Sequence, residues 1–185
     1  MTSTETATDV STWSIDPAHS EVGFAVKHLM ISTVKGHFSD VHGTIAVHET
    51  DPSRSSAEVI IDTSSIDTRS PDRDKHLRSA DFFQVEKWPN ITFRSRKVEG
   101  ATGKEGEGFR VTGDLTIRDV TKEVVLDATF EGRSHGMGSE RAAFTATTKI
   151  DRRDFGLEWN QVLEAGGVLV SNEVKISVAV QVVKE

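Results

Sequence analysis

The chain has 185 residues and no cysteine, and its 22 basic and 29 acidic side chains give a formal net charge of −7. This length suits one domain with a real core, and the lack of cysteine excludes disulfides, thiolate metal sites and cysteine nucleophiles. The acidic balance and the absence of a charge-free stretch longer than eight residues predict neither a nucleic-acid partner nor a membrane span, which need clustered cations or about 20 apolar residues.

The first segment, residues 1–11, is rich in Thr, Ser and acidic residues. This composition predicts a disordered N-terminal tail, followed by a single domain over residues 12–185. No Lys or Arg and no apolar run precede Lys27. A secretory signal needs both features, so we expect a cytoplasmic protein.

Most of the remaining chain alternates apolar and polar residues, which is the two-residue period of a half-buried strand. Eight segments with this pattern are expected to be strands: 21–29, 34–48, 56–63, 91–98, 108–118, 122–132, 141–150 and 172–184. In the second segment the apolar set changes from even positions, such as Phe38, to odd positions, such as Val41. One extra residue near Ser39–Asp40 restores the face, so the pattern predicts a β-bulge there.

Three segments interrupt the strand pattern. Ser70, Pro71 and Asp72 are typical of a helix start, and they predict a short helical excursion around residues 71–80. The glycine-rich segments 99–108 and 133–140 are expected to be loops. Antiparallel strands of this length with short connections favour an all-β, extended eight-stranded antiparallel up-and-down barrel over a sandwich.

The interior of such a barrel is either filled by side chains or wide enough for one ligand. The inward face mixes large apolar residues with small ones, so the residues alone leave both possibilities open. If the barrel is hollow, we expect the ligand to contact Val22, Phe24, Val26, Phe38, Ile45, Phe93, Val111, Gly113, Leu115, Ile117, Phe130, Phe144, Ala146, Ile176 and Val178.

The sequence offers few polar residues with a recognisable functional pattern. The helical segment is locally basic, and Arg73, Lys75, His76 and Arg78 are candidates to meet a polar headgroup if the helix lies near the barrel mouth. Convergence of the strand histidines on a metal is not readable from their spacing. No G-x-S-x-G, G-x-G-x-x-G or P-loop motif occurs. We therefore expect no catalytic residue, no metal and no cofactor.

Several motifs together make the chain resemble the YceI-like family of polyisoprenoid-binding proteins. They are the opening Trp13 to Ser20, the helical Asp72 to Leu77, Ser79 to Phe83, Trp88 to Phe93, Gly113 to Ile117 and the closing Asp151 to Leu157. No single motif is decisive, but their order and spacing match from Trp13 to about Val183.

This resemblance implies a lipocalin-like barrel whose pore holds a long isoprenoid chain, such as a quinone tail or a polyprenyl lipid. It also implies non-enzymatic binding, storage or transport of that lipid as partner, and makes a homodimer possible. Two alternatives to a lipid carrier remain open: an enzyme acting on an apolar, lipid-like substrate inside the barrel, and a protein-interaction module with a filled barrel.

Overall fold

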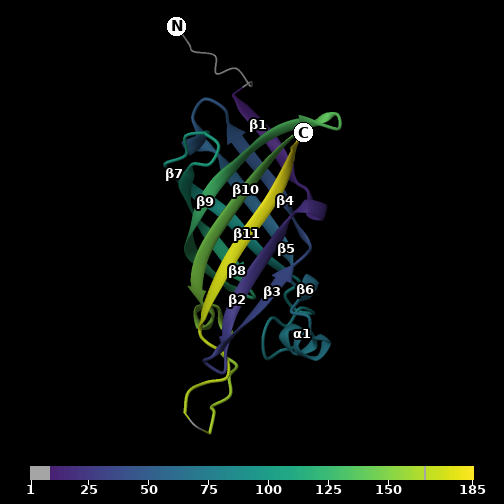
Figure 1. The fold of residues 1–185 in the computed structure, drawn as a ribbon, viewed down its shortest axis with the longest axis vertical. Helices are drawn as coiled ribbons and strands as arrows, with labels where there is room; N and C mark the ends of the chain where they lie inside the picture. The colour runs from purple at the N-terminus through teal and green to yellow at the C-terminus, as the bar shows by residue number, and fades with distance from the viewer. Residues whose placement is uncertain (1–8, 165) are drawn as a thin grey trace.

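The alternating segments form one antiparallel sheet that curls into an elongated barrel in the computed structural model, which describes residues 9–164 and 166–185 (Figure 1). The strands are β1 (Val10–Ile15), β2 (Glu21–His28), β3 (Ser32–Phe38), β4 (Val41–His48), β5 (Ser56–Asp62), β6 (Ile66–Asp67), β7 (Asn90–Glu99), β8 (Gly108–Ile117), β9 (Val120–Gly136), β10 (Ser139–Asp151) and β11 (Glu173–Lys184). The helices are α1 (Pro71–Arg78) and the short η1 (Pro17–His19), η2 (Pro52–Arg54), η3 (Thr63–Ser65) and η4 (Arg152–Phe155).

The predicted eight-stranded antiparallel barrel is confirmed. Its strands follow the order β1-β4-β5-β7-β8-β9-β10-β11, and pairing of β1 with β11 closes the ring. One edge of the long β11 pairs with β10, and the other edge pairs with two strands: Val182 lies opposite Ile15 of β1, and Ile176 lies opposite Phe24 of β2. In Figure 1 the start of β1 and the end of β11 lie at the upper end of the barrel, and α1 and residues 156–164 and 166–172 lie at the lower end.

The strand that closes the ring was not among the eight predicted segments. β1 starts at Val10, so Val10 and Ser11 pair with β4 although the sequence assigns them to the tail. Residues 1–8 of that tail lie outside the described residues. β1 is short, and Trp13 and Ile15 are its only buried apolar side chains. Its place in the ring depends on long-range pairing with β4 and β11.

The predicted bulged strand 34–48 is two strands. β3 ends at Phe38 and pairs with β2, whereas β4 starts at Val41 and pairs with β1. Both Phe38 and Val41 are buried. The change of face near Ser39–Asp40 is therefore real, but it accompanies a change of strand partner instead of a bulge.

The expected loop 133–140 is also different, because most of it continues a long hairpin. β9 runs to Gly136 and β10 starts at Ser139. The irregularity lies deeper, where Gly132 has φ +133° and the register shifts between Ala143 and Phe144. A bulge at a glycine bends the paired strands without ending them.

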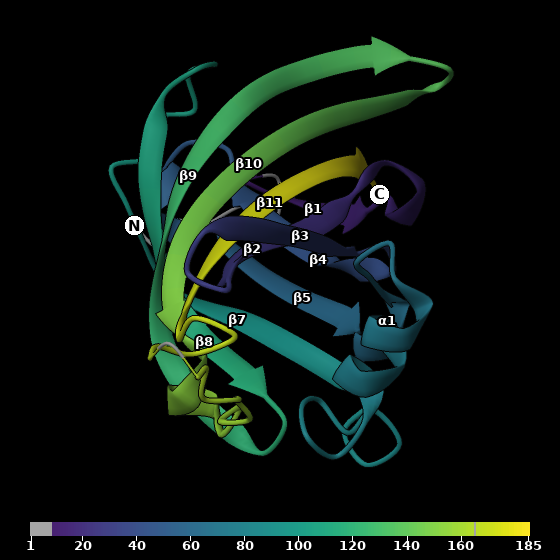
Figure 2. The same ribbon diagram turned by 60° about the horizontal axis from the view of Figure 1, so that its bottom comes forward.

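The short helix α1 covers the side of the lower barrel, next to β3 and β5 (Figure 2). Ser70 caps it as predicted, since its Oγ accepts a hydrogen bond from the Arg73 amide at 3.4 Å. The edge of β3 pairs only with the two-residue β6, so α1 and the residues after it complete the wall. None of the helices that the structure describes is long and apolar enough to cross a membrane.

Candidate functional site: two apolar cavities in the barrel

The barrel encloses two cavities that follow one another along its long axis. The upper cavity has a volume of about 620 Å³ and the lower cavity about 520 Å³. Four side chains line both cavities and form the neck between them: Val59, Phe93, Leu126 and Val178. The bore is therefore hollow at these two places, which does not fit a barrel filled by its own side chains.

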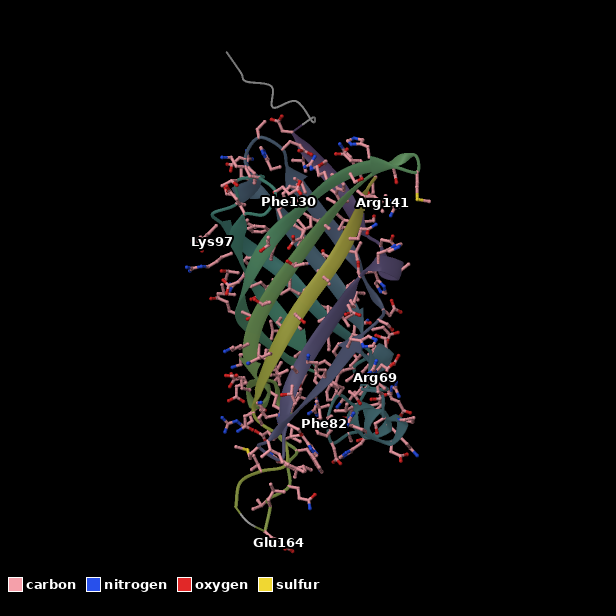
Figure 3. The ribbon with its side chains drawn as sticks, in the orientation of Figure 1. Arg69, Phe82, Lys97, Phe130, Arg141 and Glu164 are labelled. Atoms are coloured by element: carbon pink, nitrogen blue, oxygen red, sulfur yellow. The ribbon has the colours of Figure 1, made fainter. Side chains whose placement is uncertain are left out.

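All but one of the predicted ligand contacts line these cavities, because inward and outward residues alternate along each strand as the pattern requires. Ile45, Val111, Phe130, Phe144 and Ala146 line the upper cavity. Val22, Phe24, Val26, Phe38, Leu115, Ile117 and Ile176 line the lower cavity, and Phe93 and Val178 belong to the neck. Figure 3 shows Phe130 in the upper part of the barrel and Phe82 near its lower end.

Gly113 is the exception, since it lies on the inward face but lines neither cavity. A Cβ atom at this position would lie 2.5 Å from the Arg94 carbonyl oxygen and 2.5 Å from Cζ of Phe93. The ring of Phe93 covers the glycine, so the space above Gly113 is already occupied by protein.

We expect Gly113→Ala to destabilise the fold by about 1–3 kcal/mol, because the added methyl group overpacks a site whose backbone neighbour cannot move. Urea unfolding measures this loss as a lower midpoint, with the dependence of the unfolding free energy on urea concentration unchanged. A variant as stable as the wild-type chain would contradict the placement of Phe93 over Gly113.

The lower cavity is also lined by residues outside the strands, which the strand pattern did not predict. These residues come from α1, the residues after it, and the segment 156–172: Leu77, Phe82, Phe83, Leu157, Trp159, Leu169 and Val170. The sequence signal that could have found them is the density of apolar residues in segments without any period. Their rings pack together, as Trp159 lies 5.4 Å from Phe82 between ring centroids.

A buried arginine holds the segment 156–172 against the barrel. Arg152 is 4% exposed and donates hydrogen bonds to the carbonyl oxygens of Leu157 (2.6 Å), Trp159 (2.8 Å) and Ser171 (2.9 Å). Burial lowers the pKa of its guanidinium, but an arginine stays charged in proteins. Because its planar fork reaches several carbonyl groups at once, Arg152 fixes the floor of the lower cavity.

The four headgroup candidates separate into two pairs. Arg73 and His76 line the lower cavity. Lys75 is exposed on α1, and Arg78 donates to the carbonyl oxygens of Ser64 and Ile66. Neither Lys75 nor Arg78 is therefore placed to meet a ligand inside the bore.

Both candidates on the cavity lining, the exposed Arg73 and the half-buried His76, already have protein partners. Arg73 donates from Nε to Thr68 Oγ1 at 2.7 Å and from Nη2 to the Thr68 carbonyl oxygen at 2.6 Å. His76 Nε2 lies 2.8 Å from Asp81 Oδ2, and the His76 ring meets Trp159 edge to face at 4.6 Å. These contacts hold the two side chains at the cavity wall.

The upper mouth is polar, and its charged side chains are paired with one another. Ser11 Oγ donates to Glu49 Oε1 at 2.6 Å, and Arg133 pairs with the other oxygen of Glu49 at 3.0 Å while its guanidinium stacks on Trp13. Burial raises the pKa of the Glu49 carboxyl, but the bonds from Ser11 and Arg133 outweigh it and the pKa is lowered. The mouth thus keeps a charged carboxylate beside an apolar bore.

Within the described residues, no group of three or more His, Asp and Glu side chains gathers as a metal site would require. The strand histidines make separate local contacts. His42 pairs with Asp40 at 3.0 Å, and His48 Nδ1 accepts a hydrogen bond from the Asp51 amide at 3.0 Å.

Sequence comparison identifies the family of this hollow barrel. The family model for the YceI-like domain matches residues 13–182. The chain belongs to the YceI-like family.

Two curated YceI-like relatives cover most of the chain. Protein YceI of Salmonella newport (strain SL254) is 42% identical over 140 residues, which are 75% of this chain and 71% of that protein. A UPF0312 protein of Staphylococcus aureus (strain MSSA476) is 35% identical over 174 residues, which are 93% of this chain and 97% of that protein.

Solved structures show the same YceI-like fold. The Campylobacter jejuni YCEI protein superposes with a TM-score of 0.72 at 32% identity, over 86% of this chain and 90% of that chain. A polyisoprenoid binding domain from Saccharophagus degradans superposes with a TM-score of 0.69 at 15% identity, over 94% of this chain and 98% of that chain. The architecture is therefore common to proteins of low sequence identity.

Proposed function

We propose that this YceI-like protein binds a long-chain isoprenoid lipid, of quinone or polyprenyl type, and stores or transports it without chemical change. The observation that best supports this function is the pair of apolar cavities in series, joined at a neck of four apolar side chains. Two cavities that follow one another along an elongated barrel suit one extended hydrocarbon chain. The Saccharophagus degradans neighbour, described as a polyisoprenoid binding domain, supports the isoprenoid class.

The driving force is the transfer of the lipid tail from water to the bore. Each buried CH₂ group contributes about 0.8 kcal/mol, so one five-carbon unit contributes roughly 3–4 kcal/mol before costs. Ordering the flexible tail opposes much of this gain. A short tail fills one cavity, whereas a long tail passes the neck at Phe93 and Val178 and contacts both.

Arg73 and His76 are the proposed headgroup contacts, because they are the two candidates on the wall of the lower cavity. The cytoplasmic location and the homodimer stay predictions from the sequence. The enzyme alternative is less well supported, because the neck is built from four apolar side chains and the polar side chains of the lower wall, such as Asp72, Arg73 and His76, lie on one side of the cavity lining, on α1.

Extraction of the purified protein with organic solvent, followed by mass spectrometry, tests the proposal directly. A recovered prenyl lipid whose mass does not change during incubation supports a carrier. Conversion of that lipid to a product would favour the enzyme alternative. Protein that neither contains a prenyl lipid nor binds an added one would contradict the proposed function.

We expect the affinity for prenyl alcohols to rise by about ten- to thirtyfold for each added five-carbon unit, because roughly half of the transfer free energy survives the ordering cost. The rise should stop when both cavities are full. Titration of the delipidated protein with a series of chain lengths measures the trend. Equal affinity along the series would mean that the tail lies outside the bore.

A further inference from the structure

The turn between β2 and β3 has residues that its backbone does not favour. Leu29 and Met30 have φ values of +53° and +62°, and the Ile31 amide donates to the His28 carbonyl oxygen at 3.2 Å. Two central residues with positive φ are typical of a type I′ hairpin turn, where Asn-Gly is strongly preferred. Large apolar residues are strained in this conformation, so local stability does not explain them.

The same residues are also exposed to solvent. Ile31 is 83% exposed and Met30 is 59% exposed, and Val162 on the neighbouring segment is 79% exposed. The Leu29 amide donates to the Leu169 carbonyl oxygen at 2.9 Å, which joins the two segments. Leu29, Met30 and Ile31, together with the exposed Val162 on the segment to which Leu29 is hydrogen-bonded, are here called the apolar tip.

The apolar tip borders the mouth of the lower cavity. Directly next to it in the chain, Lys27 and His28 of β2 line that cavity, and Leu169 and Val170 line it from the other segment. His28 and Val170 are joined by a β-bridge. The residues that project from the lower end are therefore continuous with the residues that bound the proposed lipid site.

We propose that the apolar tip inserts into the surface of a lipid bilayer and holds the lower mouth against the membrane that supplies or receives the lipid. The inference rests on the proposed function for the lipid, but the docking surface is separate from the bore. Insertion of exposed apolar side chains at a membrane interface gains the free energy that their exposure in water costs.

The size of the tip favours a bilayer over a protein partner. A stable protein interface takes about 20–30 residues from each side, and the tip has four large apolar side chains on two narrow hairpins. Side chains on narrow projections can enter a lipid bilayer, because a bilayer does not need to match their shape as a protein surface does. The exposed Lys27 stands two residues before Leu29, where a long cationic side chain can reach lipid headgroups.

Side chains of both charge signs lie near the apolar tip, so a bilayer without net charge is the suitable test surface. Glu164 lies at the extreme lower end of the molecule (Figure 3), and Lys27 is its opposite in sign. With both signs present, the attraction comes from apolar insertion and not from net charge. Binding to zwitterionic phosphatidylcholine vesicles should therefore persist in 1 M salt, where charges are screened over about 3 Å.

Flotation with phosphatidylcholine vesicles tests the proposal on the full chain. In the double variant Leu29→Asn with Met30→Gly, the turn has its preferred residues and lacks two apolar side chains. We expect its vesicle partition to fall about tenfold or more, while its melting temperature stays the same or rises. A loss of binding in a fold of equal or greater stability cannot come from unfolding.

Met137→Asn is the matched control. Met137 is 97% exposed and has φ +52° at a hairpin tip on the upper end of the barrel, so its replacement should leave vesicle binding unchanged. Binding of a soluble prenyl alcohol is measured on every variant. Wild-type protein that binds the prenyl alcohol but does not float with vesicles would overturn membrane docking and leave the proposed function intact.

Two other outcomes also overturn the proposal. Equal flotation of the double variant and the wild-type protein would show that the tip does not insert. Alternatively, wild-type protein is a dimer by sedimentation and the double variant a monomer, in which case a second copy of the chain covers the tip. Loss of vesicle binding in the double variant with retained prenyl binding supports docking at Leu29 and Met30.

Discussion

Ala146→Phe is expected to reduce prenyl binding by at least a hundredfold while changing the free energy of unfolding by less than about 1 kcal/mol. Ala146 lines the upper cavity, and its cross-strand neighbours are Ala128 on β9 and Val178 on β11. A phenylalanine ring at this position extends into empty volume. It therefore takes the place of the lipid tail instead of displacing protein side chains.

Thermal unfolding and prenyl titration on the same samples measure both effects. Thr147→Phe is the control, because Thr147 is exposed on the outer face of the same strand and its ring would not reach the bore. A variant at Ala146 that unfolds several degrees lower and keeps its lipid would contradict the assignment of this residue to the ligand space.

Arg152→Met should produce the largest loss of stability, at least about 3 kcal/mol, because buried carbonyl groups lose their donor at a cost of about 1–3 kcal/mol each. The carbonyl oxygens concerned belong to Leu157, Trp159 and Ser171. Because all three residues lie within the segment 156–172, that segment should also open and become sensitive to proteases. Urea unfolding and limited proteolysis measure the two effects.

Arg152→Lys serves as the matched variant. Lysine retains the charge, but its single nitrogen cannot reach several carbonyl groups as the planar guanidinium does. We expect it to recover less than half of the lost stability. A methionine variant with the wild-type unfolding midpoint and wild-type proteolysis would show that Arg152 does not hold the floor of the lower cavity.

The candidate site was predictable from the sequence to the extent that it depends on local alternation. Phe24, Val111 and Ile176 face the bore because successive side chains of a strand point to opposite faces. Gly113 obeys the same alternation and still misses the cavity. Its position against Phe93 depends on the register between β7 and β8, which no single segment encodes.

The floor of the lower cavity was less predictable. Segments without a period, such as the residues after α1 and the segment 156–172, show only that apolar residues are present. Their positions follow from one buried cation, Arg152, and from ring packing between Trp159 and Phe82. Hydrogen bonds and packing of this kind form between residues brought together by the fold.

By itself, the sequence determined most of the strand segments, the capped helix at Ser70 and the membership of the YceI-like family, because period, capping and motif order are properties of neighbouring residues. The tertiary structure decided the closing strand β1, the division of 34–48 between two partners and the separation of the bore into two cavities. These features depend on which distant strands pair, and in what register, and on how side chains such as Phe93 and Val178 meet across the barrel.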